Sequence, residues 1–284
     1  MARRHQGKTG RAGIGALILS GLIAGAAFAQ GAGPPPQPNG PASMPAPFSQ
    51  DCQVGNEAIV EQSSLPNVAA ALQNRKQIKI LAIGASPMVS RRTPGPGGHS
   101  DQIRDILRQA IKGLDVVMIN RGVSGELSAQ AAPRIKIEVA LHNPDLVLWQ
   151  VGTNDALAYV PLDDLETTIT DTIHWLREHK VDAVLAGLQY VDRMAQDDHY
   201  KAVRELLRKI AARENVMIVR RYEAQRLLAQ AENSGGGLVP DEFQRSETGY
   251  ACLSQYMARA ITLGIFGRSL KVQPIANPPQ RPQN

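Results

Sequence analysis

Residues 78–86 read IKILAIGAS, an apolar run that ends in glycine, alanine and serine. Four more apolar runs follow it along the chain: DVVMIN (115–120), DLVLWQVG (145–152), DAVLAGLQ (182–189) and NVMIVRR (215–221). Short, nearly continuous apolar runs with β-branched residues are typical of strands that are buried on both faces, as in a parallel sheet. The sequence therefore predicts five buried, parallel strands.

Amphipathic segments separate these runs and predict helices. Their apolar stripes are Ile103, Ile106, Leu107, Ala110 and Ile111; Leu162, Leu165, Ile169, Ile173 and Leu176; and Val203, Leu206, Leu207 and Ile210. Ser100 is the expected N-cap of the first helix, and a last helix is expected over about 248–266. The alternation predicts a three-layer α/β fold with an open, doubly wound sheet. In such sheets ligands bind beyond the carboxyl ends of the strands.

The composition changes on both sides of this domain. Residues 1–29 combine a basic start, an apolar stretch and a small-x-small cleavage site, which is typical of a secretory signal peptide; an uncleaved membrane anchor is the alternative. Residues 30–49 are expected to form a Pro-rich linker, 50–270 the folded domain, and 271–284 a disordered Pro-rich tail. We therefore expect a periplasmic or secreted protein without a membrane span after cleavage.

The charge of the chain argues against a nucleic-acid partner. The whole sequence carries 31 basic and 26 acidic residues, a formal net charge of +5. Four of the basic residues lie in the expected signal peptide, so the mature chain has 27 against 26. This near balance leaves no electrostatic footprint for nucleic acid.

The two cysteines lie near opposite ends of the predicted domain. An even count in an oxidising compartment favours a disulfide between Cys52 and Cys252. Two buried free thiols are the alternative.

Polar or flexible residues follow the first three predicted strands. Ser86 is placed as an exposed nucleophile, and Pro87 after it has no N–H, which excludes the nucleophile elbow of the α/β-hydrolases. Gly122 and Gly125 after the second strand, and Asn154 after the third, can present N–H groups to a developing oxyanion. Three such groups at the ends of successive strands predict a catalytic site.

These stretches resemble a known family. IGAS (83–86), NRGVSGE (120–126), WQVGTND (149–155) and DEFQ…GYACL (241–253) are similar to the four blocks of the SGNH/GDSL hydrolases, in particular a secreted bacterial branch. The resemblance implies a flavodoxin-like, five-stranded parallel sheet. It also implies that Ser86 is the nucleophile and that its N–H, the Gly125 N–H and the Asn154 side chain form the oxyanion hole. Asp241 falls at the acid that orients the catalytic histidine.

Two residues depart from the family pattern. Ala85 replaces a supporting aspartate, and Gln244 stands where the catalytic histidine belongs. Histidine serves there because its pKa lies near neutrality, whereas the amide of glutamine has no usable basic site. Loss of the base in a serine hydrolase removes several orders of magnitude of rate.

Two other histidines lie near the predicted site and are possible alternative bases. His99 follows the nucleophile loop and His199 follows the fourth strand; for each, a solvated loop histidine is the competing interpretation. The acids beside His199 are expected to start a helix, and no metal site is predicted. Tyr190 is expected either to line the pocket or to pack in the core or at its rim, and Trp149 to be buried.

We therefore expect an exported serine ester hydrolase, an esterase or acylhydrolase that acts on a small-molecule or carbohydrate ester without a cofactor. Gln244 makes it impaired or atypical. The alternative is a non-catalytic envelope protein that binds glycan or a partner protein in the same cleft. The natural substrate, the acyl group and the oligomeric state do not follow from the sequence.

Overall fold

The computed structural model of the chain describes Cys52, Val54 and residues 60–61, 63–84, 98–233 and 247–267. All of these belong to one compact unit. The predicted signal peptide, linker and tail lie outside the described residues, as do Ala85, Ser86, Asp241 and Gln244.

Six strands form one sheet in the order β1-β6-β5-β4-β2-β3. The strands are β1 (Val60–Glu61), β2 (Gln77–Gly84), β3 (Asp115–Gly122), β4 (Leu146–Gln150), β5 (Asp182–Ala186) and β6 (Met217–Val219). Strands β2 to β6 pair in parallel and are the five that the sequence predicts. Strand β1 is an addition to the prediction: it extends the sheet by pairing antiparallel with β6.

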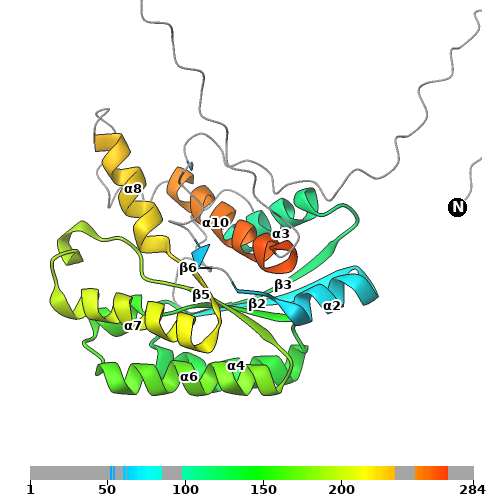
Figure 1. The fold of residues 1–284 in the computed structure, drawn as a ribbon, viewed down its shortest axis with the longest axis horizontal. Coiled ribbons are helices and arrows are strands. Elements are labelled where there is room, and N and C mark those ends of the chain that lie inside the picture. Colours follow the sequence, from blue (N-terminus) through cyan, green and yellow to red (C-terminus); the bar gives the residue numbers. More distant parts are fainter. Residues whose placement is uncertain are drawn as a thin grey trace, which may run out of the picture. The chain divides into compact units, whose positions relative to one another are not determined.

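Helices cover both faces of the sheet, as Figure 1 shows. One face carries α2 (Pro66–Arg75), α3 (Gly98–Ala110), α8 (Arg221–Asn233) and α10 (Glu247–Phe266). The other carries α4 (Ser128–His142), α5 (Thr153–Leu157), α6 (Leu162–Glu178) and α7 (Asp198–Glu214), and a short 3-10 turn, η3 (Asp192–Met194), precedes α7. The three-layer prediction is confirmed. Over the described residues, none of the helices combines the length and apolar character that membrane crossing needs.

The apolar runs of the strands supply both hydrophobic cores. In β2, Ile80 and Ala82 pack under α3 and α10, while Leu81 and Ile83 pack toward α4 and α6. All four side chains are fully buried. Successive residues of a strand point to opposite faces, so a sheet that is covered on both sides needs apolar residues at every position.

The start of α3 differs from the prediction. The helix begins at Gly98, so Ser100 lies inside it and the expected N-cap role is wrong. Ser100 is buried, and its hydroxyl accepts a hydrogen bond from Asn120 Nδ2 at 3.1 Å. The serine therefore joins α3 to the end of β3 and does not cap its own helix.

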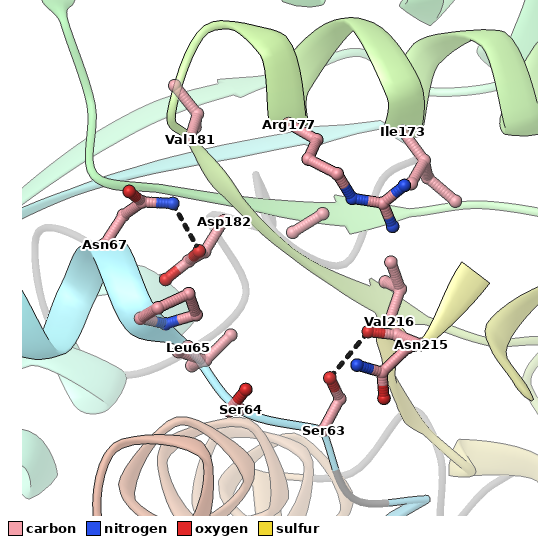
Figure 2. A pocket seen from close by; sticks show the side chains of 12 residues that line it. Ser63, Ser64, Leu65, Asn67, Ile173, Arg177, Val181, Asp182, Asn215 and Val216 are labelled. Atoms are coloured by element: carbon pink, nitrogen blue, oxygen red, sulfur yellow. Dashed lines mark hydrogen bonds between the residues drawn. The ribbon is translucent and has the colours of Figure 1, made fainter.

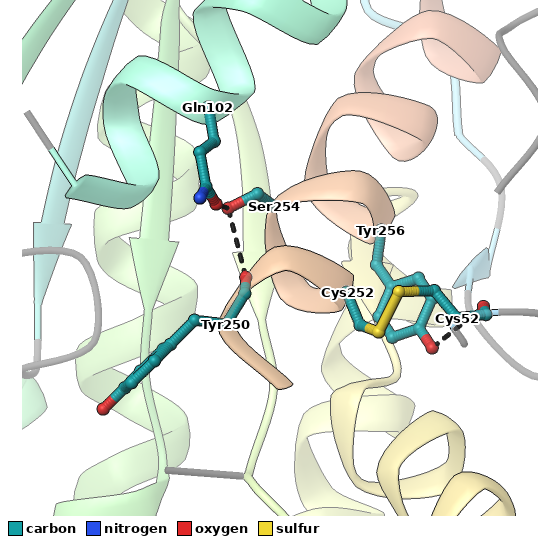
Figure 3. Close-up of a disulfide and its surroundings, with 6 residues drawn as sticks. All are labelled: Cys52, Gln102, Tyr250, Cys252, Ser254 and Tyr256. Atoms are coloured by element: carbon teal, nitrogen blue, oxygen red, sulfur yellow. Dashed lines mark hydrogen bonds between the residues drawn. A yellow bond between two sulfur atoms is a disulfide. The ribbon is translucent and has the colours of Figure 1, made fainter. Parts of the chain in front are cut away.

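A disulfide joins the two ends of the domain (Figure 3). Cys52 and Cys252 are 200 residues apart in sequence, and their Cα atoms are 5.1 Å apart. Both are buried, and Tyr256 Oη donates to the carbonyl oxygen of Cys52 at 3.2 Å. The predicted disulfide is confirmed and the alternative of two free thiols is wrong.

Candidate active site

The carboxyl ends of four parallel strands lie at one level of the sheet. Gly84, the last residue of β2, pairs in register with Gly122 of β3 and with Gln150 of β4. Gln150 in turn pairs with Ala186 of β5. The loops that follow these strands therefore meet at one edge, as the sequence predicts for the site.

Only glycine fits at position 84. Its φ is +105°, and a Cβ at this position would lie 2.1 Å from the carbonyl oxygen of Gln150. No other residue fits so close to a neighbouring backbone. The chain leaves the sheet here and enters the segment with Ala85 and Ser86, which lies outside the described residues.

The two oxyanion-hole candidates that the structure describes lie next to each other. Asn154, in the first turn of α5, donates a hydrogen bond from Nδ2 to the carbonyl oxygen of Glu126 at 3.0 Å. Gly125 precedes Glu126 and has a φ of +78° with open space where a Cβ would be. One hydrogen bond thus links the loops after β3 and β4. Gly122 is less available, because its N–H donates to Asn120 Oδ1 at 3.2 Å.

Asp155 fixes the geometry of this pair. One of its carboxylate oxygens accepts from the backbone N–H and the hydroxyl of Ser128, at 2.8 and 2.7 Å. The other accepts from the Gly152 N–H at 3.2 Å. The side chain is 1% exposed, so it tightens the turn before α5 and the first turn of α4 together.

Glu126 is the second buried acid at this edge. Its carboxylate lies 2.8 Å from Nε of Arg134, a residue of α4. Burial raises the pKa of Glu126, and the positive charge of Arg134 opposes that shift. The ion pair joins the Glu126 side chain to α4, while its backbone carbonyl accepts the hydrogen bond from Asn154.

His99 is not a solvated loop residue. It lies in the first turn of α3 and is fully buried. Nδ1 is 2.9 Å from the hydroxyl of Ser254 on α10, and the ring meets Tyr250 edge-on at 4.8 Å between centroids. Nε2 is buried without a hydrogen-bond partner within the described part of the chain.

The contacts of Ser254 assign the tautomer of His99. The Ser254 hydroxyl lies 2.8 Å from Gln102 Oε1 and 3.2 Å from the Tyr250 carbonyl oxygen, both of which only accept (Figure 3). Two acceptors beside Ser254 favour the arrangement in which its hydroxyl donates to one of them and accepts from Nδ1–H of His99, which leaves Nε2 as the unprotonated nitrogen. Burial, and secondarily the charge of Arg221, lowers the pKa of His99 to about 4, so the ring is neutral at neutral pH.

His199 lies in the first turn of α7 and is partly buried. Its ring stacks on Tyr159 at 5.1 Å with an interplanar angle of 21°. Asp197 caps the helix by accepting from the Tyr200 N–H at 2.7 Å. The acids beside His199 thus start a helix, and no cluster of three potential metal ligands occurs among the described residues.

Tyr190 and Trp149 lie in the core. The Tyr190 side chain is 9% exposed, meets Tyr222 edge-on at 5.1 Å and donates from Oη to Asp192 at 2.8 Å. Burial and the bond to Asp192 raise the pKa of Tyr190 to about 12. These contacts agree with the expectation that Tyr190 packs against its neighbours. Trp149 is 1% exposed, as the sequence predicts.

A cavity of about 230 Å³ opens at the other edge of the sheet (Figure 2). It lies at the amino ends of β5 and β6 and contains none of the predicted site residues. Asp182 in its wall accepts from Asn67 Nδ2 at 2.7 Å and from the Val68 N–H at 2.9 Å. This carboxylate, whose pKa burial raises, serves the start of α2.

Sequence reasoning missed several residues of this edge. Asn120 and Ser254 link α3 to β3 and to α10, but a single polar residue in an apolar segment carries no sign of its distant partner. Tyr159 follows α5 and was not singled out. Its position five residues after Asn154 was the available signal.

The sheet, the strand-end loops and the adjacent Gly125 and Asn154 define the class of SGNH-type proteins. The chain belongs to the Non-GDSL lipase-like family, whose model matches residues 51–266. The resemblance to the SGNH/GDSL hydrolases is thereby confirmed.

Three known proteins are similar to this chain. An arylesterase of Vibrio mimicus is 26% identical over 111 residues, which are 39% of this chain and 54% of that protein, so the chain spans about half the length of this relative. The acetylxylan esterase Axe2 of Geobacillus stearothermophilus has a TM-score of 0.54 at 21% identity, over 65% of this chain and 94% of Axe2. A lipase/acylhydrolase of Enterococcus faecalis has a TM-score of 0.54 at 21% identity, over 67% and 96%. Axe2 and the lipase/acylhydrolase have the same fold as this chain.

Proposed function

We propose that this protein is an exported serine ester hydrolase with an atypical base, and that it removes an acyl group, in particular an O-acetyl group, from a carbohydrate. The observation that carries the proposal is the hydrogen bond from Asn154 to the carbonyl of Glu126, which brings a side-chain donor beside Gly125 at the carboxyl edge of the sheet. Family membership supports ester hydrolysis. The disulfide supports an oxidising compartment.

In the proposed mechanism the Ser86 hydroxyl attacks the acyl carbonyl carbon. The N–H groups of Ser86 and Gly125 and the second amide hydrogen of Asn154 stabilise the oxyanion. A base takes the serine proton and returns it to the departing alcohol. Water then hydrolyses the acyl-enzyme and regenerates Ser86.

The base is the atypical part, because Gln244 has no basic site. Of the two stand-ins, His99 has the stronger support: it follows the segment with Ser86, packs on the helix that follows Gln244, and has an unprotonated Nε2. Its pKa of about 4 gives a weaker driving force for proton transfer than a pKa near 7. A slow enzyme is the expected outcome. His199 is the second stand-in, and its ring is engaged with Tyr159.

Carbohydrate is the proposed substrate class because Axe2, which shares the fold, is an acetylxylan esterase. Solved catalytic mutants of Axe2 replace a serine and a histidine. Gln244 is the observation that favours the rival function, a non-catalytic envelope protein that binds glycan or a partner protein.

The test is hydrolysis of 4-nitrophenyl acetate and acetylated xylan by the exported protein and five variants. Ser86→Ala should abolish activity, and Asn154→Ala should lower kcat by about 100- to 1000-fold. Gln244→His should raise it. On 4-nitrophenyl acetate, which has no sugar, a loss in His99→Gln but not in His199→Gln assigns the base. Wild type indistinguishable from Ser86→Ala, with activity appearing only in Gln244→His, refutes the enzyme and leaves the binding protein.

A further inference from the structure

Tyr159 is a large aromatic side chain exposed close to the proposed oxyanion hole. It is 60% exposed. It lies in the turn that ends α5, where Ala158 N–H donates to the Asn154 carbonyl at 2.9 Å and Tyr159 N–H to the Ala156 carbonyl at 3.2 Å. This turn joins Tyr159 to Asn154, which lies five residues earlier in the chain.

The ring is fixed in place by the start of α7. Tyr159 Oη donates to Asp197 Oδ2 at 2.6 Å, while the other oxygen of Asp197 caps α7. The ring of His199 stacks against one face of Tyr159. Asp197 and His199 follow β5, and Tyr159 follows β4. All three therefore lie beyond the carboxyl ends of these strands, at the edge of the sheet where the site lies.

A fixed, exposed aromatic ring is arranged for contact with a ligand. Pre-organisation of the ring lowers the entropy lost when a ligand binds to it. The ring offers an apolar surface with one carboxylate acceptor at its rim, from Asp197. A sugar ring has the matching chemistry, with C–H groups on its faces and hydroxyl groups around its edge.

An acyl chain is a poorer match for this surface. A long chain needs a continuous apolar groove, and within the described residues Leu157, which is 44% exposed, is the large exposed apolar side chain nearest to Tyr159 in sequence. We propose that Tyr159, supported by His199, is the platform on which a sugar ring of the substrate stacks beside the acyl group. This inference rests on the proposed function, because it places the glycan at the same site.

The test compares a sugar ester with an ester that has no ring. Tyr159→Ala should lower kcat/KM for acetylated xylotriose about tenfold, and leave kcat/KM for triacetin within about twofold. Leu157→Ala is the matched control, since it removes an exposed apolar side chain from the same turn, and should change neither. Tyr159→Phe keeps the ring and should retain most of the activity on xylotriose ester. An equal loss on both esters, or no loss on the sugar ester, overturns the proposal.

A binding measurement separates this proposal from the catalytic one. Saturation-transfer NMR with unacetylated xylotriose uses the full-length exported Ser86→Ala variant, which needs no turnover. A signal that is lost in Ser86→Ala/Tyr159→Ala and kept in Ser86→Ala/Leu157→Ala supports the platform even if wild type hydrolyses nothing. No signal, or a signal insensitive to Tyr159→Ala, refutes it even if the protein is an esterase.

Discussion

Acid should weaken the fold through His99. The imidazole is fully buried between α3 and α10. Burial first, and then the positive charge of Arg221, lowers its pKa from 6.5 to about 4, while a hydrogen bond to the Tyr250 backbone opposes the shift. The folded state therefore favours the neutral ring, and protonation costs more in the folded state than in the unfolded chain.

The sign and the size follow from this difference. Stability from the neutral ring is fully present above pH 6.5 and is lost as the pH falls toward about 4, below which this group causes no further loss. One pKa unit corresponds to about 1.4 kcal/mol, so the full effect is about 3 kcal/mol. For a domain whose total stability is roughly 5–15 kcal/mol, this is a large fraction.

Urea unfolding between pH 7 and 4 measures the effect. The free-energy difference between wild type and His99→Gln should shrink by about 3 kcal/mol over this range, because glutamine does not titrate. His179→Gln, which removes an exposed histidine, is the control for the substitution itself. A difference between wild type and His99→Gln that stays constant with pH would refute the buried neutral ring.

Three further perturbations test the fold and the site. Cys52→Ala/Cys252→Ala removes the disulfide and opens a loop of about 200 residues. The free energy of unfolding in urea should fall by up to about 5 kcal/mol. A loss below about 1 kcal/mol would contradict a stabilising role for the disulfide. Gly84→Ala should prevent folding or lower the free energy of unfolding by several kcal/mol. Gly113→Ala, which has open space around its Cβ, should lower it by only about 1–2 kcal/mol. Similar thermal melting of the two variants would be inconsistent with the crowding at the end of β2. Asp155→Asn should cost about 1.5–3 kcal/mol and lower esterase activity, and unchanged stability in urea would remove its positioning role.

The sequence was most informative where burial acts along a whole segment. Strands β2, β4, β5 and β6 are apolar at most positions because both of their faces are covered, and this signal is local. The prediction of a fully buried strand is wrong for β3, which lies at the edge of the sheet: Val116 is its buried residue and Val117 is 36% exposed. Strand β1 has two residues and shows no pattern of its own. The strand-end motifs placed Gly125 and Asn154 correctly at one edge, because parallel strands end together.

Contacts between distant segments could not be predicted in this way. A solvated loop position is one interpretation of His99 from the sequence, but the ring is buried and contacts Ser254, which lies 155 residues later. Ser100 has the identity of a helix cap, yet its hydroxyl is used by Asn120 on a neighbouring strand. In both cases the choice between a local and a tertiary partner depends on packing that one segment of sequence does not contain.

The disulfide and α10 also determine when the domain can be completed. The core on this face takes residues from α2 and α3 near its start and from α10 at its end, so it cannot close before α10 has been synthesised. Long-range closure of this kind is slow and leaves a nascent chain open. Oxidation of Cys52 and Cys252 then joins the first and last described segments of the domain covalently.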